Sequence, residues 1–221
     1  YELVPGAYDD YEITGDTEIH VVYRKSNTAG LPFKPTTING DAFAADTHYY
    51  LMSVRGGYIY HKAGEDAVKI VNSIDSDNID AYLWTFTGNI ADGITIYNKA
   101  DGAGVTLFAE SSANKTQIKF GSKADISAVE GAITLFNIAY NGDGFAFSAQ
   151  NDPTACFNRL GGATAENLCF WTNAKSPNDA GSRITFRELT ADDINNYAFA
   201  NCQVLLNTEN CVGGYTTAQL A

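Results

Sequence analysis

A motif that recurs every 50 residues constrains the fold of this chain more than any other feature. Similar apolar segments end at Phe86, Phe136 and Phe186, which are spaced by 50 residues. Because alternate side chains of a strand share a face, Trp84 and Phe86 should point the same way, toward a common core. A fixed period of about 20 to 50 residues is typical of architectures built from copies of one unit. We therefore expect three copies whose phenylalanines meet around a threefold axis.

Each copy has the pattern of several short strands joined by turns. Its opening strand ends before a turn at Gly56-Gly57, at Asp101-Gly102 and at Asn151-Asp152. Closing such strands into a barrel removes exposed sheet edges, so the repeat predicts an all-β fold, a β-trefoil of three units of about 50 residues. A two-sheet sandwich is the structural alternative, because short strands with regular turns also fit it. The units are expected at about 48–88, 92–138 and 143–189.

The ends of the chain lack the repeat. Residues 1–24 alternate in polarity around a turn at Gly15-Asp16, which predicts an N-terminal β-hairpin. Thr190 and Asp193 fit a capping box at the start of a short helical tail. The expected organisation is an N-terminal β extension or the end of a preceding domain at 1–30, the β-trefoil at 31–189, and a helical tail or linker at 190–221.

Composition and charge exclude several classes of partner. The net charge of −12 would repel phosphate backbones and anionic lipid headgroups, so nucleic acid is not an expected partner. No apolar run approaches the roughly 18 residues that a membrane-spanning helix requires. The chain starts at Tyr1 without an initiator methionine or a signal segment, and we expect it to be cut from a larger protein.

The cysteines fall into two locally spaced pairs, Cys156 with Cys169 and Cys202 with Cys211. A disulfide in each pair would close a short loop, as expected for an exported protein in an oxidising compartment. Free buried thiols are the alternative, since cysteine is among the most buried residue types. No C-x-x-C motif is present, so zinc or thioredoxin chemistry is not indicated.

Local signatures of catalysis are absent: the sequence has no metalloprotease, serine hydrolase, phosphate-loop or dinucleotide motif. We expect no catalytic residue and no cofactor. A glycosidase with paired carboxylates is the remaining enzyme alternative, because such pairs leave no local motif. The acidic segment Asp75–Asp80 lacks the glycine and the final glutamate of a calcium-binding loop, so no metal site is predicted.

Sugar binding needs an exposed aromatic ring to stack on a pyranose, together with amides or carboxylates for its hydroxyls. Strand parity places Trp84 in the core, which leaves Trp171 as the better candidate, with Asn158 and Asn173 as hydroxyl partners. Burial of Trp171 in the core is the competing interpretation. The polar turn that carries Tyr140 and Asp143 is a weaker candidate of the same type.

Three stretches, 47–56, 81–89 and 93–100, resemble a ricin-B-like β-trefoil module found in large exported proteins of Bacteroides-type bacteria. The resemblance covers about residues 31–189 and implies attachment to a glycoside hydrolase or sialidase domain. The Gln-x-Trp triplet of ricin-type lectins is missing from the three matching strands.

The resemblance implies a non-catalytic, carbohydrate-binding accessory module, exported to the periplasm, the cell surface or the medium. Its partners would be a weakly bound glycan and neighbouring domains of the same polypeptide. A structural spacer without a ligand is the alternative function, and a glycoside hydrolase catalytic domain is a third.

Overall fold

The computed structural model describes residues 2–3, 23–24, 30–62 and 64–196. The chain divides into two compact units, residues 1–32 and 33–221. In the first unit, β1 (Glu2–Leu3) pairs antiparallel with β2 (Tyr23–Arg24). The predicted turn at Gly15-Asp16 lies outside the described residues.

The second unit holds the repeats. A small arm, β3 (Ile38–Asn39) and β4 (Ala42–Phe43), precedes them. The first repeat has β5 (Tyr49–Val54), β6 (Gly57–Tyr60), β7 (Lys69–Val71), the 3-10 helix η1 (Ser76–Tyr82) and β8 (Leu83–Asn89). The second has β9 (Gly93–Asn98), β10 (Val105–Phe108), β11 (Lys119–Ser122), the helix α1 (Lys123–Ser127) and β12 (Phe136–Asn141). The third has β13 (Gly144–Ala149), β14 (Asp152–Asn158), β15 (Cys169–Thr172), the 3-10 helices η2 (Ser176–Asn178) and η3 (Ala180–Ser182), and β16 (Ile184–Leu189).

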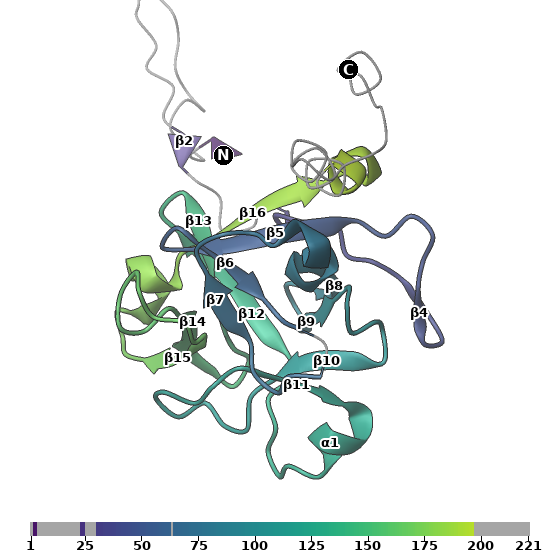
Figure 1. Cartoon of the computed structure of the whole chain (residues 1–221). Helices are drawn as coiled ribbons and strands as arrows, with labels where there is room; N and C mark the ends of the chain where they lie inside the picture. The colour runs from purple at the N-terminus through teal and green to yellow at the C-terminus, as the bar shows by residue number, and fades with distance from the viewer. Residues whose placement is uncertain (1, 4–22, 25–29, 63, 197–221) are drawn as a thin grey trace, which may run out of the picture. The chain divides into compact units, whose positions relative to one another are not determined.

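The first and last strands of the three repeats close a barrel. Pairing runs from β5 through β8, β9, β12 and β13 to β16, and β16 pairs back with β5. Each repeat also contributes one hairpin, namely β6–β7, β10–β11 and β14–β15. Figure 1 shows β10–β11 and β14–β15 near the same end of the barrel. The predicted β-trefoil is confirmed, and the sandwich alternative is wrong because the sheet closes on itself.

The 50-residue period is strictest where the hairpins meet. Bridges join Ala67 to Lys119, Gln117 to Cys169 and Asn167 to Lys69, so each hairpin makes the same contact with the next. At the centre of this contact Val68, Ile118 and Leu168 are fully buried. Burying three apolar side chains at one junction stabilises all three hairpins together. The repeat in the sequence thus encodes a threefold junction.

The predicted meeting of three phenylalanines is only partly right. Phe86 and Phe136 are fully buried, whereas Phe186 is half-buried. The ring of Phe86 lies 5.8 Å from that of Phe186, but Phe136 packs on Phe157 at 4.9 Å. The register of the barrel strands explains why Phe136 does not join Phe86 and Phe186. The connections between the strands differ in length from one repeat to the next, so residues 50 apart do not occupy equivalent positions in the barrel. The residue that matches Phe136 in the other repeats is Trp84 or Ile184, each paired with the first strand of its own repeat.

An aromatic side chain from outside the repeats fills the space that the third phenylalanine leaves. Phe33 stacks on Phe86 with ring centroids 3.8 Å apart and lies 5.6 Å from Phe186. Trp84 is fully buried, as predicted, and its indole N–H donates to the Ile59 carbonyl at 2.9 Å. Large buried rings in contact, with the indole N–H bonded, stabilise this core.

The predicted capping box is present at Thr190 and Asp193. The hydroxyl of Thr190 accepts from the amide of Asp193 at 3.1 Å, and the Asp193 carboxylate accepts from the amide of Thr190 at 2.9 Å. This capping box starts a helix over residues 191–196. Residues beyond 196 lie outside the described part of the chain. No helix among the described residues is long and apolar enough to cross a membrane.

Candidate functional site

Strand geometry brings the side chain of Trp171 to the outer face of the third hairpin. On β15, Phe170 is fully buried against Phe157, with ring centroids 5.7 Å apart. Successive side chains of a strand point to opposite faces, so Trp171 points away from the core and is half-buried. Its carbonyl accepts from the Ser176 hydroxyl at 2.7 Å. Trp171 therefore stands between strand and surface, beside a turn.

Only the third unit carries an aromatic ring at this position. Val71, Gly121 and Trp171 are spaced by 50 residues and occupy the same register position in their hairpins, opposite Tyr58, Thr106 and Cys156. Valine and glycine offer no flat face to a sugar ring, whereas an indole does. The three hairpins have the same backbone register, but their side chains differ, and only the third presents an aromatic ring at this position.

Two asparagines from different repeats contact the backbone of the segment that follows Trp171. Asn173 is exposed, and its side-chain oxygen accepts from the Lys175 amide at 2.9 Å. Asn114, from the second repeat, accepts from the Thr172 amide at 3.2 Å across 58 residues of sequence. These contacts use the oxygen of each side-chain amide. The two NH₂ groups have no hydrogen-bond partner among the described residues and are able to donate to a sugar hydroxyl.

Asn114 is a residue that the sequence did not indicate. It follows no motif, and its place beside Thr172 depends on the packing of the second hairpin against the third. The Thr172 hydroxyl, which donates to the Ser112 carbonyl at 2.9 Å, fixes the same loop. A contact between segments this far apart leaves no local pattern to read.

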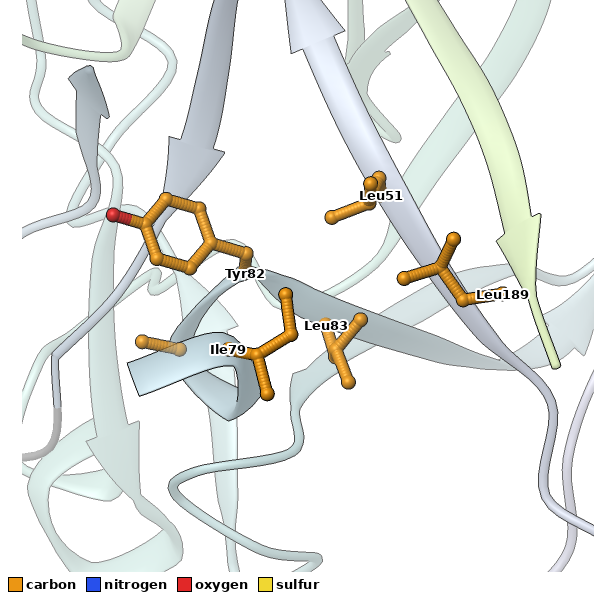
Figure 2. Close-up of a cluster of buried hydrophobic side chains, with 6 residues drawn as sticks. Leu51, Ile79, Tyr82, Leu83 and Leu189 are labelled. Carbon is orange, nitrogen blue, oxygen red and sulfur yellow. The ribbon is translucent and has the colours of Figure 1, made fainter. Parts of the chain in front are cut away.

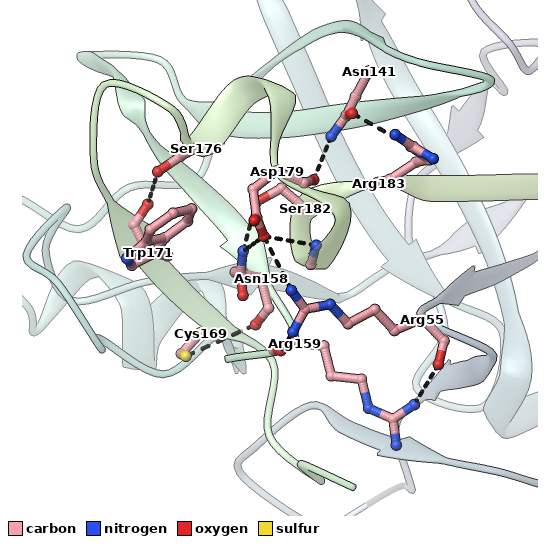
Figure 3. Close-up of polar contacts among 11 residues, drawn as sticks. Arg55, Asn141, Asn158, Arg159, Cys169, Trp171, Ser176, Asp179, Ser182 and Arg183 are labelled. Carbon is pink, nitrogen blue, oxygen red and sulfur yellow. Dashed lines mark hydrogen bonds and ion pairs between the residues drawn. The ribbon is translucent and has the colours of Figure 1, made fainter. Parts of the chain in front are cut away.

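Asn158, which we expected to hold a sugar hydroxyl, has a structural role instead. It is 1% exposed, and its amide donates to the Asp179 carboxylate at 3.0 Å and to the Ser182 hydroxyl at 2.9 Å. Figure 3 shows its side chain pointing into this network. Asn158 is the last residue of β14 and points inward, so its amide bonds buried polar partners and does not reach solvent.

The same network ties the first repeat to the third. Arg55 donates to the Arg159 carbonyl at 3.2 Å and contacts the Asp179 carboxylate at 3.4 Å. Arg159 is 1% exposed and donates to the carbonyls of Ala165 and Arg55 and to the Asn72 side chain. Burial, with a smaller effect from Arg55, lowers the pKa of Arg159. Figure 3 shows the two arginines side by side.

Tyr140 and Asp143 lie at the β12–β13 turn, whereas Trp171 lies on the β14–β15 hairpin. The Tyr140 ring packs on Phe145, with centroids 5.0 Å apart. The Asp143 side chain is 83% exposed and lies 3.3 Å from Arg183. These residues form a polar turn of their own, next to Asn141.

The predicted disulfide between Cys156 and Cys169 is wrong, because both residues are free thiols. The register explains why: Cys156 stands opposite Trp171, and Cys169 stands opposite Asn158. The two sulfur atoms lie near different carbonyls, those of Pro153 at 3.6 Å and Asn158 at 3.8 Å. Burial, with Asp152 adding, raises the pKa of Cys156 to about 12. Burial also raises the pKa of Cys169. Both thiols are therefore inert near neutral pH. The other predicted pair, Cys202 and Cys211, lies outside the described residues.

Other candidate chemical groups have structural partners. Asp75 caps η1 and accepts from the Asp77 amide at 3.1 Å. His61 is 1% exposed, and its ring nitrogens lie 2.6 Å from the Asp101 carboxylate and 2.5 Å from the Glu65 carbonyl. Within the described residues, no three His, Cys, Asp or Glu side chains are grouped to hold a metal ion.

Comparisons with known proteins show the fold. No known family description matches the sequence, and no curated protein matches it. A GlcNAcα1-4Gal-releasing endo-β-galactosidase from Clostridium perfringens has 14% identity and a TM-score of 0.50, over 65% of this chain and 33% of that chain. A mosquitocidal holotoxin has 12% identity and a TM-score of 0.51, over 68% of this chain and 18% of the toxin.

The Rhizoctonia solani agglutinin is matched almost along its whole length. It has 14% identity and a TM-score of 0.50, over 66% of this chain and 98% of the agglutinin. The chain therefore spans a third or less of the enzyme and of the toxin, but nearly all of the agglutinin. Identities this low show a shared fold and leave binding and activity to the side chains.

Proposed function

We propose that this chain is a non-catalytic carbohydrate-binding module of a larger exported glycan-processing protein, and that its third unit holds the glycan. The observation that carries the proposal is the half-buried ring of Trp171 on the outer face of the third hairpin. A sugar ring would stack on the indole, and the free NH₂ groups of Asn173 and Asn114 would donate to its hydroxyls.

Two further observations support binding and not catalysis. The fold is shared with an agglutinin over nearly its whole length, and with part of an endo-β-galactosidase. The buried Asp101 carboxylate is paired with His61, and the buried thiol of Cys156 has a raised pKa, so neither group is available as a catalyst near neutral pH. A binding module of this kind would act by tethering, since it raises the local concentration of substrate around a linked enzyme.

A structural spacer without a ligand is the second candidate function. Asn158 favours it, because the amide expected to bind sugar is used inside the protein. A spacer would need the packed core and the Arg55–Arg159 contacts, but it would not need the half-buried indole of Trp171 on its outer face.

Intrinsic fluorescence of the isolated module distinguishes the two functions. The chain has two tryptophans, and Trp84 is fully buried with its N–H bonded, so a change on adding glycan reports on Trp171. Titration with a panel of host and plant glycans should give a saturable change in emission. If no glycan in the panel changes the emission, the spacer becomes the better assignment.

A further inference from the structure

The tripeptide Asn-Gly-Asp occurs twice in the chain, each time at the turn of a two-residue hairpin. Residues 39–42 form the β3–β4 turn and residues 141–144 form the β12–β13 turn, and in each the first residue pairs with the last. The aspartate of neither turn has a positive φ, whereas φ is 64° at Gly40 and 61° at Gly142. This is the pattern of a type II′ turn, whose first central residue is glycine. The two turns therefore match in sequence and in backbone, and only their surroundings differ.

An asparagine followed by glycine is open to an intramolecular reaction. The backbone nitrogen of the glycine attacks the side-chain carbonyl carbon of the asparagine, the proton of that nitrogen leaves with the side-chain NH₂ as ammonia, and a succinimide ring forms. Water then opens the ring at either carbonyl, which yields an aspartyl or an isoaspartyl linkage. Glycine permits the attack because it has no side chain to block it and adopts a wide range of backbone angles.

Asn39 is free to react in this way. Asn39, Gly40 and Asp41 are exposed, and Figure 1 shows the β3–β4 arm on the outside of the barrel. The Asn39 side chain has no hydrogen-bond partner among the described residues. A Cβ placed on Gly40 would meet no atom within 4 Å, so there is space around this peptide bond for the attack.

Asn141 has the same neighbours in sequence after it, but its side chain is held in place. It is 1% exposed, its amide donates to the Asp179 carbonyl at 2.7 Å, and its side-chain oxygen accepts from Arg183 at 3.4 Å. Figure 3 shows Asn141 with these two partners. The Arg183 guanidinium also covers Gly142, because a Cβ there would lie 2.8 Å from it. Reaction at Asn141 therefore requires that this network opens first.

We propose that Asn39 is a site of spontaneous deamidation in this protein, and that the fold protects Asn141 from the same reaction. Water is the co-reactant, and ammonia is the leaving group. The inference is independent of the proposed function, because it uses neither Trp171 nor the asparagines assigned to the glycan.

The isoaspartyl product changes the arm. It adds one carbon to the main chain between Asn39 and Gly40, so a two-residue turn can no longer connect the strands. The pairing of Ile38 with Phe43 then loses its register. Phe43 packs on the barrel, with its ring centroid 5.9 Å from that of Tyr97. Deamidation at this single bond is therefore expected to loosen the contact between arm and barrel.

Peptide mass spectrometry tests the inference on the whole chain, incubated at mildly alkaline pH in water labelled with heavy oxygen. Each deamidation takes up one oxygen atom from this water, so label in the two Asn-Gly peptides counts the events at each site. Asn39 should deamidate at least about tenfold faster than Asn141, because an opening free energy of about 1.4 kcal/mol already slows a reaction tenfold.

The unfolded chain supplies the matched control. In concentrated urea the two Asn-Gly-Asp segments lose their tertiary contacts, so their rates of label uptake should become similar. Asn39→Gln lengthens the side chain, so that the attack would have to close a larger ring, and it should abolish uptake at residue 39 in the folded chain. Equal rates at the two asparagines in the folded chain, or a difference that persists in urea, would overturn the inference.

Amide NMR of the incubated protein tests the effect on the arm. New signals for Phe43 and Tyr97 should grow in step with the isoaspartyl product and should not appear in the Asn39→Gln variant. Unchanged signals of both residues in fully deamidated protein would contradict the loosening of the arm. The glycan response of Trp171 is measured on fresh protein, so its outcome is separate from this test.

Discussion

The first and third repeats share a backbone and differ in what their outer faces do. In the first, Leu51, Ile79, Tyr82 and Leu83 form a buried cluster, which Leu189 of the third repeat joins, as Figure 2 shows. In the third, Trp171 is half-buried, and a polar network is built around Asn158 and Asp179. The outer face of the first repeat is therefore part of the core, whereas the outer face of the third repeat is partly exposed to solvent. Fold and binding are therefore encoded by different side chains of the same unit.

The largest expected effect separates the two tryptophans. Trp84→Ala should lower the free energy of unfolding by about 3 to 5 kcal/mol, because a fully buried ring and its hydrogen bond are lost. Trp171→Ala should lower it by only about 1 to 2 kcal/mol, because its side chain is half-buried on the outer face of the hairpin. Urea unfolding of both variants measures the difference. Equal losses would show that Trp171 belongs to the core.

The next effect separates two asparagines of the third unit. Asn158→Ala should cost about 2 to 3 kcal/mol, since Asp179 and Ser182 lose a buried donor. Asn173→Ala should change stability by less than about 0.5 kcal/mol, because its side chain is exposed. Thermal unfolding of the two variants decides the matter. A larger loss for Asn173 would reverse the roles that we assign.

The sequence predicts the fold well because the 50-residue repeat reflects the contact between the three hairpins. Val68, Ile118 and Leu168 keep the 50-residue spacing, since the three hairpins must meet at a common junction. The barrel strands drift from that spacing, because the connections between them differ in length. Phe136 therefore matches Trp84 and not Phe86, which no count along the sequence could reveal.

The site was predictable only in part. Strand parity correctly separated Trp84 from the candidate Trp171, because alternation is a local property. The burial of Asn158 depends on Asp179, which lies on a later turn, and Asn114 reaches Thr172 from another repeat. Such contacts arise from packing between repeats, so one sequence carries no signal for them.

The cysteines give a smaller effect that tests the register of the third hairpin. Without reductant, Cys156 and Cys169 should resist iodoacetamide in the native protein and react after unfolding. Peptide mass spectrometry measures both states. A Cys156–Cys169 disulfide would instead leave both unlabelled after unfolding and would contradict the register.

Stability at alkaline pH should follow from the same burial. The folded pKa of Cys156, at about 12, is higher than its ordinary value of 9.0. The folded state therefore holds this proton more tightly, and its contribution to stability is complete below pH 9 and is lost as the pH rises toward 12. Cys156→Ala should show a shallower loss of stability than the wild type across that window. Identical slopes in urea unfolding would contradict the burial of this thiol.

The most direct test of the account exchanges one side chain between the two repeats. Trp171→Val gives the third hairpin the residue that Val71 is in the first. A loss of about 1 kcal/mol corresponds to a shift of roughly 2 to 4 °C in a domain of this size, so the melting temperature should stay within that range. Retention on a glycan array should fall at least about tenfold, because the stacking ring is gone. Unchanged retention by the valine variant would contradict the claim that the third unit binds glycan through Trp171.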